Sequence, residues 1–193
     1  MYSVTLNLNQ IIKLTDEQFY QLATAHPDLQ IERSPEGELV IMPPTGGESG
    51  KRNFSLLGQL WFWVQQNSEL GVGFDSSTEF NLPNGGDRSP DASWVKLDRW
   101  NALTEEQKQK FPPICPDFVI ELRSETDKLK PLQKKMQEYL DSGLRLGWLI
   151  DPKTKKVEIY RLGQPVEILE NPATLSGEDV LPEFLLDLKP IFC

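Results

Sequence analysis

The stretch PDFVIELRS, Pro116–Ser124, decides how the rest of the chain is interpreted. Phe118–Leu122 is a nearly continuous apolar run, which is typical of a strand covered on both faces of a sheet. Glu121 places a carboxylate inside this run, where a core strand favours an apolar side chain. The stretch therefore predicts a central strand that carries a functional or ion-paired acid.

A second acidic stretch, SPDASWV at Ser89–Val95, precedes the first by about 30 positions and carries Asp91 at a predicted strand start. A hard cation such as Mg²⁺ takes oxygen ligands, usually one or two carboxylates together with water and phosphate oxygens. If the two strands pair so that their ends meet, Asp91 and Glu121 can hold such an ion. Arg123 follows Glu121 by two positions, and alternate residues of a strand share a face.

The chain before these stretches begins with a helix and a hairpin. Thr15 followed three residues later by Gln18 predicts a capped helix start, and His26-Pro27 ends that helix. A turn at Ser34–Gly37 separates two strand-like segments, which predicts a hairpin. The remaining predictions for this half are an amphipathic helix at 48–66 and strands at 71–75, 78–82 and 91–97. The apolar stripe of this helix consists of Phe54, Leu57, Leu60, Trp61 and Val64.

The second half adds two helices and a strand pair around the central strand. A brief helix is expected at 104–110 and a long one at 127–142, where Gly143 has a C-cap role. Gly147–Pro152 and Lys156–Tyr160 then form a strand pair. This order predicts an α/β fold with a central mixed β-sheet flanked by helices.

Composition limits the classes of protein that remain. The chain of 193 residues suits one domain, and its 38% hydrophobic and 25% charged content is that of an ordinary globular protein. We expect no membrane span and no secretion signal in Met1–Asn9, and only Cys115 and Cys193 occur, which suits a reducing cytoplasm. A net charge of −9 counts against nonspecific nucleic-acid binding. The densest basic cluster comprises Lys128, Lys130, Lys134, Lys135, Arg145, Lys153, Lys155 and Lys156.

Pro90-Asp91 and Glu121-Leu122-Arg123 resemble the motif of the PD-(D/E)xK nuclease superfamily. The resemblance becomes closer downstream: residues 117–127, 135–139, 143 and 148–152 look like the Uma-two branch of bacterial restriction-endonuclease-like proteins. Similarity extends from about Leu14 to Leu188. We expect one domain over residues 1–193, with an N-terminal helix and hairpin appendage (1–45), a restriction-endonuclease-like core (46–162) and a C-terminal extension (163–193).

This resemblance implies a nuclease that depends on Mg²⁺ or Mn²⁺ and acts on DNA, with Asp91 and Glu121 as metal ligands. The superfamily usually has Lys where this chain has Arg123, and Arg is a poor general base because it does not readily give up a proton. In this branch the lysine is displaced to the following helix, which makes Lys135 the catalytic candidate. The superfamily also often places a Glu on its first core helix, and Glu48 matches that place as a further metal ligand.

Helical phase gives an independent test of Lys135. At 100° per residue Lys135 lies on the flank of the buried stripe, whereas Lys134 points nearly opposite, into solvent. Lys128, one heptad earlier, shares the flank of Lys135. The stripe itself consists of Leu129, Leu132, Met136, Tyr139 and Leu140.

Alternative interpretations remain open at this point. Asp91 after Pro is also a common strand-start residue, Glu121 can form a salt bridge with Arg123 or Lys135, and Lys135 can extend along the helix surface. The chain can be a catalytically inactive nuclease fold that serves as a binding or assembly module. A third alternative is another hydrolase that uses two carboxylates, such as a glycosidase, in which one acid must stay protonated. Nothing in the sequence suggests a sugar-binding cleft.

An excess of apolar residues predicts self-association. Phe54, Trp61 and Leu181–Leu186 give more apolar surface than one small sheet needs, so we expect a homodimer. The tryptophans can stack on bases, but their positions within amphipathic segments favour core packing or a subunit interface.

Overall fold

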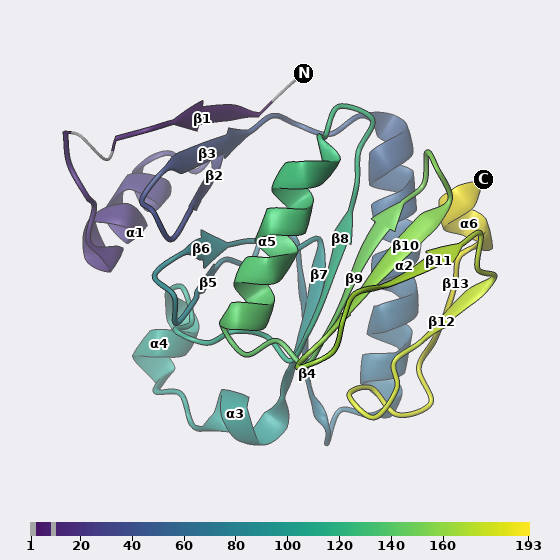
Figure 1. The fold of residues 1–193 in the computed structure, drawn as a ribbon. Helices are drawn as coiled ribbons and strands as arrows, with labels where there is room; N and C mark the ends of the chain where they lie inside the picture. Colours follow the sequence, from purple (N-terminus) through teal and green to yellow (C-terminus); the bar gives the residue numbers. More distant parts are fainter. Residues whose placement is uncertain (1–2, 9–10) are drawn as a thin grey trace.

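A computed structural model describes residues 3–8 and 11–193, so part of the N-terminal stretch examined for a secretion signal lies outside the described residues. Its centre is a six-stranded mixed sheet in which β8 and β9 run parallel and the other neighbours antiparallel. Figure 1 shows the strands of this sheet in the middle of the molecule. In spatial order its strands are β11 (Glu167–Glu170), β10 (Lys156–Arg161), β9 (Leu146–Asp151), β8 (Phe118–Leu122), β7 (Ala92–Lys96) and β4 (Gly71–Asp75).

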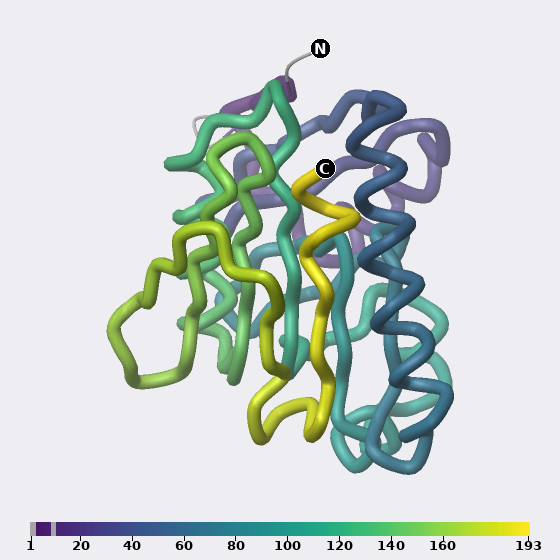
Figure 2. The backbone as a smooth tube through the Cα atoms, turned by 90° about the vertical axis from the view of Figure 1, so that its right-hand side faces the viewer, coloured from purple at the N-terminus to yellow at the C-terminus, as the bar shows by residue number. Residues whose placement is uncertain are grey.

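Two long helices cover opposite faces of this sheet (Figures 1 and 2). The helix α2 (Gly47–Gln66) packs on the face that carries Trp94 and Phe118, and α5 (Leu129–Asp141) packs on the face that carries Val119. Alternation along β8 sends Phe118 and Ile120 to the α2 side and Val119 and Glu121 to the α5 side. The fold is therefore mixed α/β with a central mixed sheet flanked by helices, as the sequence predicts.

A smaller sheet lies beside the N-terminal helix α1 (Asp16–Ala25). The Thr15 hydroxyl accepts a hydrogen bond from Gln18 N–H and the Gln18 side chain bonds back to Thr15 N–H, so the predicted helix start is confirmed as a capping box. The predicted hairpin is also present. The strands of this sheet are β1 (Val4–Leu6), β3 (Leu39–Met42), β2 (Gln30–Arg33), β6 (Asp87–Arg88) and β5 (Phe80–Asn81), in spatial order.

The C-terminal segment packs on the α2 side of the main sheet. It forms the hairpin of β12 (Thr174–Ser176) and β13 (Leu185–Asp187) and the short helix α6 (Lys189–Phe192). Phe184 stacks on Trp148, and Leu181 and Leu186 are buried in the same cluster. This finding corrects one premise of the predicted homodimer, because Leu181, Phe184 and Leu186 of the segment Leu181–Leu186 cover the core of their own chain.

The orientation of α2 also differs from the prediction. Phe54 and Trp61, expected in the buried stripe, are 80% and 62% exposed, while Leu56 and Trp63 face the sheet. Both faces of the helix are apolar, so its period alone does not identify the inner one. The remaining helices, α3 (Leu97–Asn101) and α4 (Glu105–Gln109), form the surface excursion before β8. None of the described helices is both long and apolar enough to cross a membrane.

Candidate active site

Asp91 and Glu121 lie opposite each other at one end of the central sheet. Ala92 pairs with Ile120 in the register of β7 and β8, and one further step along both strands sets Asp91 against Glu121. Directly opposed residues of an antiparallel pair share a face, with Cβ atoms about 4.5–5.5 Å apart. The backbone N–H of Leu122 donates a 2.7 Å hydrogen bond to Oδ2 of Asp91, which holds this side chain beside the end of β8.

Glu121 is buried and Asp91 is half-buried, and both carboxyl groups are harder to ionise for that reason. Burial raises the pKa of Asp91 to about 6, although the Leu122 N–H and Lys135 act in the opposite direction. Burial raises the pKa of Glu121 to about 8, and Lys135 opposes this shift while the nearby Asp91 adds to it. A cation that binds next to these two carboxyl groups stabilises their ionised forms.

Lys135 supplies positive charge from α5. Its side chain is buried, and Nζ lies 2.7 Å from Oε1 of Glu121. Of the two neighbouring lysines, helical phase directs Lys135 toward the sheet and Lys134 into solvent, and the Lys134 side chain is 57% exposed. Burial alone disfavours the ammonium form, but Glu121 and Glu32 outweigh it and raise the pKa of Lys135 above its usual value.

Glu32 is a member of this cluster that sequence reasoning missed. It comes from β2, is 2% exposed, and its Oε1 accepts hydrogen bonds from Lys135 Nζ (2.7 Å) and Ser89 N–H (3.0 Å). Burial opposes ionisation, but Lys135 and Arg88 hold the pKa of Glu32 below its usual value. The only sequence signal was a charged pair inside the short strand segment Ile31–Arg33, which indicates neither burial nor a partner.

Arg88 of β6 continues the network away from Asp91. Its guanidinium donates to Oε2 of Glu32 at 3.0 Å and to Oε2 of Glu138 at 2.5 and 2.9 Å. Glu138 lies one turn after Lys135 on α5, so one helix contributes both a cation and an anion to the buried network. The small sheet and α5 are thereby joined through charges that water does not reach.

The structure places the other two predicted site residues outside this network. Arg123 follows β8, and its guanidinium donates to Oδ2 of Asp151 at 2.6 Å and to the carbonyl oxygen of Asp127 at 3.1 Å. Glu48 lies in the first turn of α2 with an exposed side chain, 3.6 Å from Lys51. Neither residue forms a hydrogen bond or ion pair with Asp91 or Glu121 within the described part of the chain.

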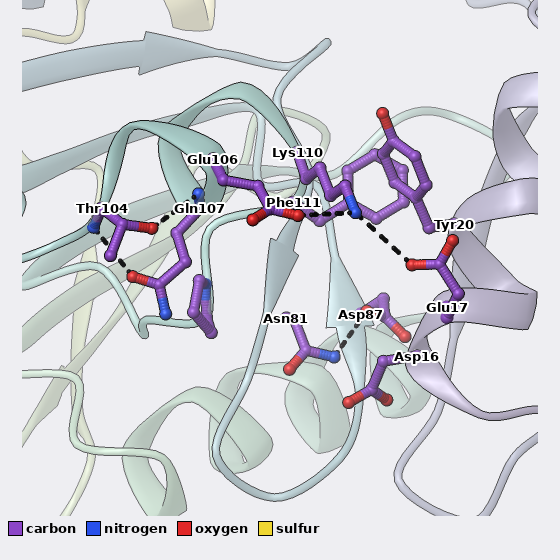
Figure 3. Close-up of a pocket in the computed structure, with 11 residues that line it drawn as sticks. Asp16, Glu17, Tyr20, Asn81, Asp87, Thr104, Glu106, Gln107, Lys110 and Phe111 are labelled. Atoms are coloured by element: carbon purple, nitrogen blue, oxygen red, sulfur yellow. Dashed lines mark hydrogen bonds and ion pairs between the residues drawn. The ribbon is translucent and has the colours of Figure 1, made fainter.

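A cleft of about 390 Å³ opens elsewhere, between α1, α4 and the small sheet (Figure 3). Its charged groups are already paired: Lys110 lies 3.2 Å from Glu106 and 3.5 Å from Glu17, and Asp16 and Asp87 pair with Arg33. Asp87 also lines it and accepts a hydrogen bond from Asn81. The residues that line this cleft do not include Asp91, Glu121 or Lys135.

The donor atoms at the end of β7 and β8 fit a hard divalent cation. Oδ2 of Asp91 and Oε1 of Glu121 accept protein hydrogen bonds, the latter from Tyr139 at 3.0 Å, whereas none reaches Oδ1 of Asp91 or Oε2 of Glu121 among the described residues. No cluster of three or more His, Cys, Asp or Glu side chains in residues 3–8 and 11–193 is arranged to hold a metal by itself. Mg²⁺ does not need such a cage, because it retains water and takes substrate phosphate oxygens.

Comparisons with known proteins identify relatives of the whole chain. A family model described as "Uma2: Putative restriction endonuclease" matches residues 16–189. The fold is similar to the crystal structure of a "putative nuclease belonging to DUF820" from Anabaena variabilis ATCC 29413, with a TM-score of 0.77 and 23% identity over 93% of this chain and 97% of that one. This similarity confirms the predicted fold class. A search of curated proteins finds no match.

Proposed function

Because the chain belongs to the Uma2 family of restriction-endonuclease-like proteins, we propose that it is a divalent-metal-dependent endonuclease that hydrolyses phosphodiester bonds of DNA. The observation that carries this proposal is the meeting of Asp91, Glu121 and Lys135 at one end of β7 and β8. Perturbed ionisable groups cluster at functional sites. Two opposed carboxylates beside a buried lysine have no role in packing an apolar core.

Asp91 and Glu121 are the proposed ligands of Mg²⁺ or Mn²⁺, through the two oxygen atoms that no hydrogen bond from the described residues reaches. The bound ion supplies Lewis-acid polarisation of the phosphate and a more acidic water. Asp91 is held for this task by the Leu122 N–H, and Glu121 by Tyr139 and Lys135. These bonds fix both side chains before a ligand binds, which reduces the ordering that binding requires.

Lys135 is the proposed cation of the reaction. Its Nζ, beside Glu121, would donate to a phosphate oxygen and stabilise the negative charge that develops there. Glu32 and the carbonyl oxygen of Ser89 hold the other side of the ammonium group. Glu32 is therefore proposed as a positioning residue that acts through Lys135.

Arg123 and Glu48 have supporting roles in this proposal. Arg123 ties the segment after β8 to Asp151 and to the Asp127 carbonyl group, and Asp127 is a charge that acts on Asp91. Arg123 thus stabilises the border of the site. Glu48 remains a candidate ligand through water, since α2 begins at the end of the sheet at which β8 ends (Figure 1).

DNA requires positive charge near the site despite the net charge of −9. Lys128 and Lys130, at the start of α5, are exposed, and they are proposed contacts for the phosphate backbone. Other members of the predicted basic cluster are already paired, such as Lys156 with Glu170 and Arg145 with Asp179. Few phosphate contacts imply a shallow dependence of DNA affinity on salt.

Cleavage of supercoiled plasmid DNA with Mg²⁺ or Mn²⁺ tests the proposal. Asp91→Asn is expected to lower the rate about 100-fold or more, because it removes a charged ligand without changing side-chain size. Asp98→Asn is the matched control, since Asp98 is 84% exposed and its ion pair is with the exposed Lys96. Full activity in Asp91→Asn, with the control also active, contradicts the assigned site.

One observation favours the alternative of an inactive binding or assembly module. Lys135 is already held between Glu32 and Glu121, so its charge is compensated inside the protein. A module without catalysis is expected to give no metal-dependent cleavage and no heat of Mn²⁺ binding that depends on Asp91. If the wild type shows neither metal-dependent cleavage nor heat of Mn²⁺ binding, the result supports this alternative.

A further inference from the structure

Helix α2 carries a second apolar face that its own chain does not cover. Phe54, Trp61 and Phe62 are 80%, 62% and 59% exposed. At 100° per residue these aromatic residues and Gly58 lie within about a quarter of the helix circumference, roughly opposite Leu56 and Trp63, which face the sheet. A helix with apolar residues on both faces is normally buried on both.

A groove runs beside this face. Its lining includes Phe54, Gly58 and Phe62 from α2 and Asp187 and Pro190 from the C-terminal segment. Gln59 fixes the two walls, because its side chain accepts a 2.7 Å hydrogen bond from Asp187 N–H and donates to the Asp187 carbonyl oxygen at 3.1 Å. The groove is thus a formed surface whose walls are bonded to each other.

Gly58 has no explanation within the single chain. A glycine inside a helix is less stable than alanine by roughly 0.5–1 kcal/mol. A Cβ atom added at Gly58 meets no atom within 4 Å, so neither packing nor backbone geometry of this chain excludes a side chain there. Close approach of another backbone to α2 at this position explains the residue.

The charge pattern identifies the kind of partner. The segment 53–68 contains no Asp, Glu, Lys or Arg, although the chain is 25% charged and has a net charge of −9. Depletion of charge and enrichment in aromatic residues are the signs of an interface core. Two copies of an acidic chain repel each other least through a surface of this kind, where Asp187 of the groove wall contributes a carboxylate and helix residues 53–68 contribute none.

We propose that this face binds the same face of a second copy, with the two α2 helices crossing at Gly58. A two-fold interface of this type requires a self-complementary surface, and the face offers both parts: a groove, and Trp61 on its other side as the group that fills the partner's groove. At about 200 Å² for each aromatic side chain, the three exposed portions supply roughly 400 Å² per copy. A standard interface buries about 800 Å² per partner, so the aromatic residues form its core and the groove walls complete it.

The inference is independent of the proposed nuclease activity. The face lies on α2, whereas Lys135 lies on α5, which covers the opposite side of the sheet, and Glu121 contacts Lys135 on that side. Substitutions on this face are therefore expected to change association without changing Mn²⁺ binding at Asp91.

Sedimentation velocity at micromolar concentration tests the dimer. The wild type is expected to sediment as a dimer, and Trp61→Glu is expected to weaken self-association about 100-fold or more, as for a central aromatic residue of an interface. The Trp61→Glu variant is expected to fold because Trp61 is exposed, and far-ultraviolet circular dichroism checks this. Leu162→Glu, at a 59% exposed leucine outside α2, is the matched control and is expected to stay dimeric. A wild-type monomer, or a Trp61→Glu variant that is folded and still dimeric, overturns the proposal.

Two further variants locate the crossing point. Gly58→Ala is expected to stabilise the isolated helix but to weaken the dimer about 10-fold, because the added methyl group separates the helices. Gly58→Cys in a Cys193→Ser background is expected to form a disulfide between copies on mild oxidation, and Leu162→Cys in the same background is not. Equal dimer affinity in Gly58→Ala, no crosslink through Gly58→Cys, or binding of neutral phosphatidylcholine vesicles in place of self-association contradicts the assignment.

Discussion

The two long helices of this protein cover opposite faces of one sheet, and they bury opposite kinds of side chain. Helix α5 buries Lys135 and Glu138 together with Met136 and Tyr139. The buried residues of helix α2 are apolar. They include Leu60 and Trp63, which pack against apolar residues of the sheet such as Trp94.

The exposed faces reverse this difference. The outer side of α5 carries charged residues such as Lys134, whereas the outer side of α2 carries uncovered aromatic rings. Burying charge is costly unless it is paired, and exposing aromatic rings is costly unless they are covered. The α5 side therefore points to chemistry, and the α2 side to an interface.

Lys135→Met tests the charged side with the largest expected effect. The substitution leaves Glu32 and Glu121 buried without their shared cation, so the free energy of unfolding is expected to fall by about 3–5 kcal/mol and nuclease activity to be lost. Urea denaturation measures the change. Adding Glu121→Gln is expected to restore part of the stability and none of the activity. A Lys135→Met variant that is as stable as the wild type contradicts the claim that the buried Glu32 and Glu121 depend on this cation.

Trp63→Ala tests the apolar side. Trp63 packs edge-on against Trp94, and its Nε1–H donates to the Pro182 carbonyl oxygen at 2.9 Å. Truncation is expected to cost about 3–5 kcal/mol, as large as the loss at Lys135 but without its ionic cause. Trp63→Phe is the comparison variant and is expected to lose less, since much of the packing remains. A loss below about 1 kcal/mol in Trp63→Ala shows that α2 does not anchor this face.

Glu79→Gln gives a smaller effect, which depends on pH. Burial raises the pKa of Glu79 to about 9, the like charges of Glu32 and Asp87 add to this, and Lys135 and Arg88 oppose it. One carboxyl oxygen of Glu79 has no hydrogen-bond partner within the described residues.

Between an unfolded pKa of 4.5 and a folded pKa of about 9, the folded chain binds more protons than the unfolded one. The wild type is therefore expected to lose stability relative to Glu79→Gln as pH rises through this window. Urea unfolding at about pH 6 and about pH 9 measures the difference, with the exposed Glu105→Gln as control. A difference that is the same at both pH values contradicts the neutral form of Glu79.

Lys134→Ala is expected to have the smallest effect. Lys134 neighbours Lys135 in sequence, but it is 57% exposed and pairs with the partly exposed Glu36 at 3.1 Å. Its removal is expected to change the free energy of unfolding by at most about 1 kcal/mol, measured by the same urea titration. A loss as large as that of Lys135→Met shows that burial does not separate the two lysines.

Local patterns were sufficient to predict part of this arrangement. The apolar run around Glu121 marked β8, the Thr15 and Gln18 spacing marked the start of α1, and helical phase selected Lys135 over Lys134. Each of these depends on residues close in sequence, where side-chain direction follows from the period of the element.

Features that depend on distant pairing were not predicted. Glu32 is buried because β2 pairs with β6, whose two residues are too few to show a strand period. For α2 the pattern indicated a helix but not its inner face, since Phe54 and Trp63 are equally apolar. The C-terminal hairpin settles the choice by packing Phe184 against Trp63.

Calorimetric titration with Mn²⁺ tests the central claim that Asp91 and Glu121 form a divalent metal site. The wild type and Asp98→Asn are expected to bind the ion with the same affinity, and Asp91→Asn combined with Glu121→Gln is expected to bind none at this site while remaining folded. No binding to the wild type, or equal binding to the double variant, contradicts the claim.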